Sequence, residues 1–174
     1  TEKLKAGWDM IQKNIRQTSD LVMDLLSFSK ERQPEYEPCR PNDIALNVCE
    51  ILEDTAHEHN LKILRDLDPS IDQVSMDPRS VHSILMNLIS NAVDACIFDE
   101  NTGKSRRVTL KTVLEKEDVV RFEVSDNGIG MTPEVQEKIF TSFFSTKGHM
   151  GTGLGLLVTR KLIEEHNGTI ELQS

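Results

Sequence analysis

Two asparagines, Asn87 and Asn91, lie four residues apart in an apolar segment that begins after Asp77-Pro78. On a helix, side chains at this spacing project from one face, one above the other. Burying two carboxamides costs free energy unless their polar atoms find partners. Because an amide oxygen can ligate Mg²⁺, one interpretation of the pair is a cation site. A polar pair at a solvent-exposed edge is the other interpretation, and the spacing alone does not decide between them.

A second segment with possible binding chemistry is Asp126-x-Gly128-x-Gly130, which directly follows a predicted strand. The carboxylate can accept a hydrogen bond from a ligand amine, and the glycines permit sharp turns and close approach of the backbone. Taken alone, the same segment is equally a simple turn from a strand to a helix.

Gly151, Gly153 and Gly155 alternate with other residues and lead directly into a predicted helix over residues 154–166. Unhindered backbone N–H groups and a helix N-terminus together favour an anion such as phosphate. The segment lacks the Gly-Lys-Ser/Thr ending of a Walker A loop and the spacing of a dinucleotide-binding fold. Lys147, in the glycine-flanked segment upstream, adds a mobile positive charge.

The remaining pattern predicts the elements that must position these residues. Asp77 is expected to cap a helix that begins at Pro78. Mixed helices and strands without regular βαβ alternation indicate an α+β domain with two layers. The other predicted helices cover residues 42–59, 133–140 and 154–166, and the predicted strands cover residues 61–67, 73–76, 107–115, 119–125 and 169–172.

Residues 2–31 are predicted to form one long amphipathic helix followed by a proline-containing linker, residues 34–41. The heptad-like spacing favours self-association, while an ordinary surface helix packed on its own domain is the alternative. The apolar seam of this helix consists of Leu4, Trp8, Ile11, Ile15, Thr18, Val22 and Leu25.

Composition limits the partners and the compartment. The net charge of −9 and the pI near 5.0 argue against a nucleic-acid partner. Cys39, Cys49 and Cys96 form no CxxC pair, as expected of reduced thiols in a cytoplasmic protein. The sequence shows neither a membrane-spanning run nor a signal peptide, but it begins inside a helix, so we expect a membrane anchor only in parts of a longer protein.

Four segments together resemble the catalytic ATP-binding domain of bacterial sensor histidine kinases, which has the Bergerat (GHKL) fold. The likeness covers about residues 40–174, and residues 2–31 resemble the second helix of the family's dimerisation hairpin. It implies a two-layer α/β sandwich whose mixed sheet is covered by helices on one face. The segments, in the order of the N, G1, F and G2 boxes, are Asn87-x-x-x-Asn91-Ala, Asp126-x-Gly-x-Gly130, Phe140-x-x-Phe143-Phe144 and Gly151-Thr-Gly-Leu-Gly155-Leu.

The resemblance implies a role for each motif. Asn91 would coordinate Mg²⁺ on the triphosphate, with assistance from Asn87. Asp126 would accept a hydrogen bond from the adenine amino group. Asp94 stands where many members of the family have Lys, which changes the charge beside the site.

The same resemblance makes residues 141–152 an ATP lid from which Lys147 reaches the phosphates. Gly151, Gly153 and Gly155 would then contact the β- and γ-phosphates. Asn91 and Lys147 are the residues that it implies act in the transfer step. The further nucleotide-binding positions that we expect are Asp94, Gly128, Ile129, Gly130, Phe143, Thr152 and Leu154.

The implied activity is that of an ATP-dependent protein-histidine kinase in two-component signalling, with a homodimer and a response-regulator receiver domain as partners. ATP-hydrolysing relatives carry Glu where this chain has Asn87, and an amide cannot take a proton from water. The family's phosphoacceptor His is absent, so autophosphorylation of the isolated chain is not expected. A serine-directed kinase of the same fold and a nucleotide-binding regulatory module are the alternatives. The domains expected are residues 1–33 (helix), 34–41 (linker) and 42–174 (ATP-binding, without the family's last strand).

Overall fold

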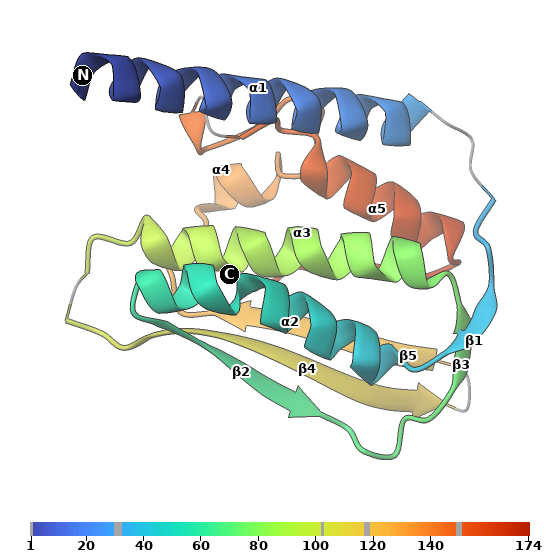
Figure 1. Ribbon diagram of the computed structural model, residues 1–174. Coiled ribbons are helices and arrows are strands. Elements are labelled where there is room, and N and C mark those ends of the chain that lie inside the picture. Colours follow the sequence, from blue (N-terminus) through green and yellow to red (C-terminus); the bar gives the residue numbers. More distant parts are fainter. Residues whose placement is uncertain (1, 30–32, 102, 117–118, 149–150) are drawn as a thin grey trace.

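The computed structural model describes residues 2–29, 33–101, 103–116, 119–148 and 151–174 (Figure 1). Most of its helices and strands agree with the sequence prediction. In chain order they are α1 (Glu2–Ser29), β1 (Glu37–Cys39), α2 (Pro41–Glu58), β2 (Leu61–Leu67), β3 (Val74–Met76), α3 (Pro78–Ile97), β4 (Arg106–Lys116), β5 (Val119–Asp126), α4 (Pro133–Gln136) and α5 (Gly155–Glu165).

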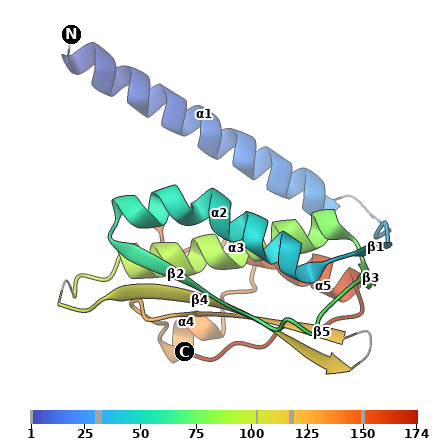
Figure 2. The same ribbon diagram turned by 60° about the horizontal axis from the view of Figure 1, so that its bottom comes forward.

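The main sheet has the strand order β2-β4-β5 and is mixed. Strand β2 runs parallel to β4, with Ile63 opposite Val108, and β4 runs antiparallel to β5, with Leu110 opposite Val124. Helices α2 and α3 lie side by side on one face of this sheet, and α5 packs against α3 (Figures 1 and 2). The predicted α+β class, with helices on one face of a mixed sheet, is therefore confirmed.

The hydrophobic core lies between the sheet and the two helices that cover it. Leu85 and Ile89 of α3 are completely buried, as are Val48 of α2 and the β4 residues Val108 and Leu110. Each such side chain contributes roughly 1.5–3 kcal/mol relative to an exposed one. Because Leu85 and Ile89 fix one side of α3 in the core, the side that bears Asn87 and Asn91 is held in one orientation.

Asp77 caps α3, as the sequence predicts. Its Oδ1 accepts hydrogen bonds from the backbone N–H groups of Arg79 and Ser80 at 3.0 and 3.2 Å. Its Oδ2 accepts from the Ser80 hydroxyl at 2.9 Å and from the Glu35 N–H at 3.3 Å. The last bond joins the start of α3 to the segment that precedes β1.

Strand β1 lies within the segment that the sequence analysis interpreted as a linker. It pairs antiparallel with β3, with Pro38 opposite Ser75. Proline has no N–H to donate, so prolines usually occur in edge strands or turns and not in the central strands of a sheet. A two-stranded sheet consists only of edges, which is why Pro38 is tolerated here.

Two predicted elements are shorter or absent. Helix α4 ends at Gln136 because the chain then tightens, with the Lys138 N–H donating to the Val135 carbonyl only three residues earlier. The strand expected over residues 169–172 is not formed, and the described residues after α5 are irregular. Ile170 is only half-buried and Leu172 is exposed, so little apolar burial holds this segment on the sheet.

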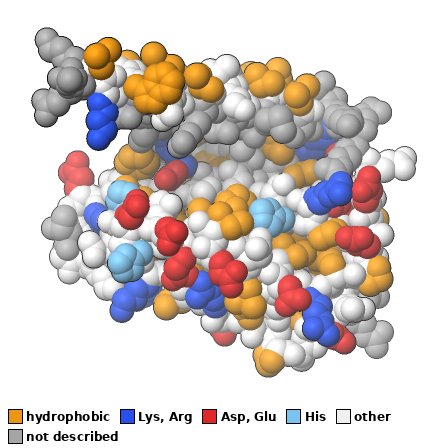
Figure 3. Space-filling model, viewed as in Figure 1, with side chains coloured by type: hydrophobic (Ala, Val, Ile, Leu, Met, Phe, Trp, Pro, Cys, Tyr) orange, Lys and Arg blue, Asp and Glu red, His pale blue; other side chains and the backbone are white. Residues whose placement is uncertain are grey.

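Helix α1 lies beside α5, and many of its apolar side chains face solvent (Figure 3). Seam residues Trp8, Ile11, Ile15 and Val22 are between 48% and 63% exposed. Among the described residues, no helix combines the length and the hydropathy needed to cross a bilayer.

Candidate functional site

Three segments contact the surface of α3. Their contact points on α3 are four residues apart, which is about one helical turn. The first turn of α5 approaches Asn87, the side chain of Lys147 reaches Asn91, and the loop after β5 packs on Ala95. Positions four apart lie one above the other on a helix. The motifs that the sequence analysis singled out are therefore neighbours in space.

The two asparagines are joined in a chain of hydrogen bonds. Asn91 Nδ2 donates to Asn87 Oδ1 at 3.2 Å, and Asn87 Nδ2 donates to the Thr159 hydroxyl oxygen on α5 at 2.7 Å. Each carboxamide has a donor nitrogen and an acceptor oxygen. When one of the two forms a hydrogen bond on one side, the other is left for a partner on the opposite side. Here the atom left facing outward is Asn91 Oδ1.

A cationic side chain lies at that oxygen. Lys147 Nζ donates to Asn91 Oδ1 at 2.5 Å and forms an ion pair with Asp94 Oδ2 at 2.6 Å. The Lys147 side chain is 24% exposed and that of Asp94 39%, so solvent screens the pair only in part. Amide and carboxylate oxygens on one helical turn thus already hold a positive charge.

Close packing leaves little room for a side chain at Gly153 and Gly155, where α5 begins. A Cβ at Gly155 would lie 2.7 Å from Asn87 Oδ1, and one at Gly153 would lie 2.5 Å from the Phe143 carbonyl carbon. Gly153 also has a φ of +67°, which glycine adopts without strain. The Phe143 N–H donates to the Gly153 carbonyl at 3.0 Å and closes the base of the expected lid.

The loop after β5 rests directly on the last turn of α3. The Ile129 N–H donates to the Ala95 carbonyl at 3.1 Å. A Cβ at Gly128 would lie 2.5 Å from the same carbonyl oxygen, so only glycine fits there. Asp126 Oδ1 accepts from the Gly128 N–H at 2.8 Å, which fixes the carboxylate at the start of the loop.

Polar contacts from the preceding loop hold this segment from its other side. Lys104 Nζ donates to the Gly128 carbonyl at 3.2 Å and pairs with Asp99. The hydrogen bond from Lys104 lowers the pKa of the Asp99 carboxyl below its usual value, so this carboxyl is ionised at neutral pH. Beneath the loop, burial raises the pKa of the Cys96 thiol, which therefore remains protonated.

Two of the expected nucleotide-binding side chains are largely exposed. Ile129 is 66% exposed, and Phe143, with a φ of +62°, is 67% exposed. Phe143 is therefore a surface residue and not part of the hydrophobic core. Phe140 and Phe144 are half-buried, and Ile139 is buried.

The other expected positions lie within the converging segments. Leu154 is buried, Thr152 accepts from the Leu154 N–H through its hydroxyl at 3.3 Å, and Gly130 has a φ of +70°. Residues 149–150 of the expected lid lie outside the described residues. Sequence reasoning missed Thr159 and Lys104, because a single Thr in a helix and a single Lys in a polar loop carry no motif.

The family comparison agrees with this geometry. Residues 76–174, more than half of the chain, match the sequence model of the histidine kinase-, DNA gyrase B- and HSP90-like ATPases. Sensor histidine kinase ZraS of Klebsiella oxytoca is 30% identical over 154 residues, which cover 88% of this chain and 32% of that relative. Sensory histidine kinase/phosphatase NtrB of Vibrio alginolyticus is 34% identical over 122 residues, which cover 67% of this chain and 35% of that relative. The chain thus spans about a third of the length of these relatives.

Solved structures show the same fold. Full-length ShkA in complex with AMPPNP superposes with a TM-score of 0.80 at 23% identity, covering 96% of this chain and 35% of that one. Histidine kinase ThkA in complex with response regulator protein TrrA superposes with a TM-score of 0.74 at 27% identity, covering 97% of this chain and 46% of that one.

Proposed function

We propose, because this chain belongs to the family of histidine kinase-, DNA gyrase B- and HSP90-like ATPases, that it is the ATP-binding kinase core of a sensor histidine kinase. It holds Mg²⁺-ATP and presents the γ-phosphoryl group to a protein histidine. The observation that carries this proposal is the cluster of Asn87, Asn91 and Asp94 on α3 with Lys147 from the segment before α5, beside the glycine-rich start of α5.

The oxygens of this cluster suit a hard cation. Asn91 Oδ1 and Asp94 Oδ2 both contact the Lys147 ammonium, so this spot already stabilises positive charge. Mg²⁺ prefers oxygen ligands and is commonly held by one or two protein groups together with phosphates. Asn91 would hold the ion, with Asn87 assisting, and Lys147 would be freed to contact the phosphates. When bound, the ion neutralises negative charge on the triphosphate.

The state of Asn87 favours transfer over hydrolysis. Its Nδ2 donates a hydrogen bond to the Thr159 hydroxyl oxygen, and its Oδ1 accepts one from Asn91 Nδ2, so both ends of the amide are occupied. An amide is not a general base even when free. Nothing at this position can therefore activate water, and the bound γ-phosphoryl group is kept for another acceptor.

The two glycine segments bind the remaining parts of the nucleotide. Asp126 accepts a hydrogen bond from the adenine amino group, and the loop at Gly128 and Gly130 lets the base approach the backbone. The N-terminus of α5 at Gly155 and the preceding Gly153 offer backbone N–H groups to the phosphates. Catalysis then consists of orientation and charge stabilisation, as in other phosphoryl transfers.

A transfer assay tests the proposed activity. The chain is incubated with Mg²⁺, ATP labelled on the γ-phosphate and a separate dimerisation hairpin that carries a histidine. We expect label on the hairpin that is labile in acid and stable in base. A response-regulator receiver domain added afterwards is expected to take up this label, as the complex of ThkA with its regulator suggests.

The chemistry of the label separates the alternatives. Acid-stable label on serine would favour the serine-directed kinase instead. Tight binding of Mg²⁺-ATP without transfer to hairpins from several sensor kinases would favour the regulatory module. A hairpin in which the histidine is replaced by Ala is the control.

Gly128→Ala is expected to weaken ATP binding at least about 10-fold, which corresponds to about 1.4 kcal/mol. The added methyl would overlap the Ala95 backbone of α3, so the loop must move and carry Asp126 with it. Overpacking of this kind also costs about 1–3 kcal/mol of stability. Calorimetric titration and urea unfolding measure the two effects.

Gly103→Ala is the matched control for this change. Its added methyl would lie 3.4 Å from Asn101 Oδ1, an ordinary contact in the neighbouring loop. ATP affinity should remain within about twofold of the original for Gly103→Ala. Equal ATP affinities for Gly128→Ala and Gly103→Ala would show that the loop at Gly128 is not part of the ATP-binding site.

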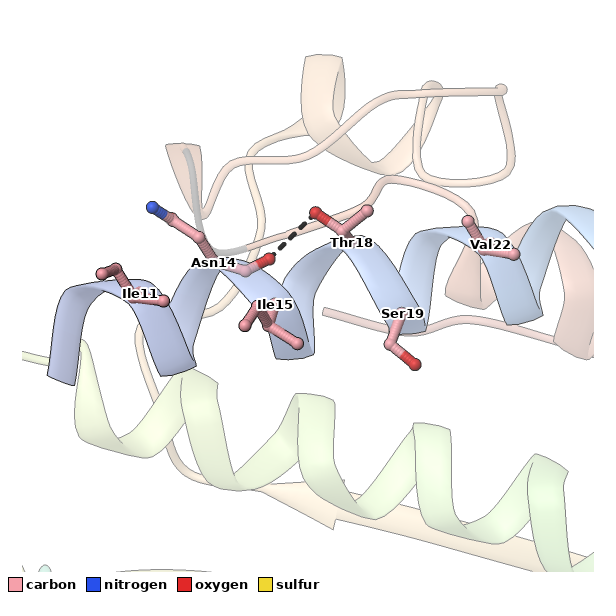
Figure 4. A pocket seen from close by; sticks show the side chains of 6 residues that line it. All are labelled: Ile11, Asn14, Ile15, Thr18, Ser19 and Val22. Carbon is pink, nitrogen blue, oxygen red and sulfur yellow. Dashed lines mark hydrogen bonds between the residues drawn. The ribbon is translucent and has the colours of Figure 1, made fainter. Parts of the chain in front are cut away.

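We propose further that α1 forms a homodimer through its apolar seam. The seam residues Trp8, Ile11 and Ile15 are more than half exposed, an unusual state for large apolar side chains at helical spacing. Ile11, Ile15 and Val22 also line a pocket of about 490 Å³ along α1, together with three polar residues (Figure 4). Knobs from a second copy of the helix suit such a surface.

Ile15→Asp is expected to convert the dimer into a monomer, because it places a charge in the centre of the seam. Lys5→Asp, at an exposed position off the seam, changes the charge of the same helix and should leave the dimer intact. Sedimentation velocity reports the mass of each variant. A monomer before substitution, or a dimer that survives Ile15→Asp, would contradict this interface.

A further inference from the structure

Thr159 is a buried hydroxyl in the interface between α5 and α3. The residue is 2% exposed, and its Oγ1 accepts a hydrogen bond from Asn87 Nδ2 at 2.7 Å. The two residues are 72 positions apart in the chain, so this contact joins two helices that the sequence does not connect locally. Buried hydroxyl groups normally have hydrogen-bond partners, and the partner of this one is a residue of the candidate cation site.

The direction of the hydrogen bonds that join Lys147, Asn91 and Asn87 explains why an acceptor is needed at Thr159. An ammonium group only donates hydrogen bonds, so Asn91 must turn its Oδ1 toward Lys147. Asn91 Nδ2 then faces Asn87 and requires Asn87 Oδ1 as its acceptor. Asn87 Nδ2 is left pointing into the interface, where it needs an acceptor of its own. Thr159 Oγ1 supplies it.

Any cation at Asn91 imposes the same direction, because a metal ion also binds the oxygen end of an amide. Without an acceptor at position 159, this arrangement leaves a buried N–H group unsatisfied, which is unfavourable. The reversed arrangement would turn Asn87 Oδ1 toward position 159 and Asn91 Nδ2 toward the cation, which an N–H group cannot bind. A hydroxyl can donate or accept, so the cation sets the direction of the hydrogen-bond chain, and the Thr159 hydroxyl supplies the acceptor that this direction requires.

We propose that Thr159 is a positioning residue that holds Asn91 Oδ1 in the orientation that binds Mg²⁺. It acts through Asn87 and touches neither the ion nor the nucleotide. Its place on α5, one turn after Gly155, also ties the metal-binding turn of α3 to the helix whose start faces the phosphates. This inference rests on the proposed function, since it assumes Mg²⁺-dependent binding of ATP.

Thr159→Val tests the inference because valine has nearly the shape of threonine but no hydroxyl. ATP affinity is measured by calorimetry in the presence of Mg²⁺ and in the presence of EDTA. We expect a loss of about 10-fold in Mg²⁺, equivalent to about 1.4 kcal/mol, and less than about a twofold change in EDTA. Thr159→Ser, which restores the oxygen, is expected to return the Mg²⁺-dependent affinity to within about threefold of the original.

A thermodynamic cycle with Asn87→Ala keeps the inference testable if Thr159→Val alone lowers stability. Once Asn87 is removed, Thr159→Val should have no further effect on the ratio of the two affinities. Equal losses in Mg²⁺ and in EDTA, or no loss in either, would overturn the positioning role. If the original chain itself binds ATP no better with Mg²⁺, the failure lies in the proposed function rather than in the role of Thr159.

Discussion

Asp126→Asn is expected to weaken ATP binding by at least about 100-fold, or about 2.8 kcal/mol, while leaving the loop folded. The Gly128 N–H that donates to Asp126 Oδ1 can donate equally well to the amide oxygen of asparagine. The second carboxylate oxygen becomes an NH₂ group, which faces the adenine amino group donor to donor. Calorimetric titration with ATP measures the loss, and circular dichroism checks that the fold is retained.

Inosine triphosphate adds a specificity test, because it has a carbonyl oxygen where adenine has its amino group. Asparagine can donate to that oxygen, so the preference for ATP over inosine triphosphate should fall at least about 10-fold in Asp126→Asn. Glu123→Gln removes one negative charge from the same strand at an exposed ion pair and serves as the control. ATP affinity in Asp126→Asn equal to that of this control would refute the adenine contact.

Asn91→Ala is expected to slow histidine phosphorylation by roughly 100- to 1000-fold, the scale for losing one preorganised electrostatic group. The substitution removes the oxygen at the centre of the cluster and leaves Lys147 paired with Asp94 alone. Most of the gain in ATP affinity that Mg²⁺ provides should disappear with it. Rates of label transfer and affinities with and without Mg²⁺ report the two losses.

Ser90→Ala is the matched control, because Ser90 adjoins Asn91 on α3 but donates its hydroxyl to the Asn87 backbone carbonyl at 3.1 Å. It should transfer label at close to the original rate and melt within a few degrees of Asn91→Ala. Unchanged Mg²⁺ dependence in Asn91→Ala would move the metal site away from this residue.

Local signals predicted most of the fold correctly. The alternation of apolar and polar residues over Leu61–Leu67 predicted strand β2, and Asp77-Pro78 predicted the start of α3. Both signals are local, because caps and periodicity depend on neighbours in sequence. The strand expected near the C-terminus failed because strand formation also depends on what lies beside it. Strand β1 was missed for the converse reason, since its partner β3 holds a proline-containing segment that has no strand signal of its own.

The candidate site divides in the same way. Motif spacing predicted Asn87, Asn91 and Asp126 as site residues, because each motif is contiguous in sequence. Thr159 could not be found, since its only signal is a hydrogen bond across 72 residues. The pairing of Lys147 with Asp94 also could not be predicted from the sequence, because the two residues are 53 positions apart and meet only in the folded chain.

The proposed function requires that this chain binds Mg²⁺-ATP and keeps the γ-phosphoryl group for transfer. Both properties can be measured together by titrating the chain with ATP in a calorimeter, with and without Mg²⁺, while free phosphate is followed in the same samples. We predict binding in the range of roughly 1 µM to 1 mM that is usual for enzyme substrates, tightened at least about 10-fold by Mg²⁺, with phosphate release no faster than in buffer. Absence of binding at millimolar ATP, or steady release of phosphate by the chain alone, would contradict it.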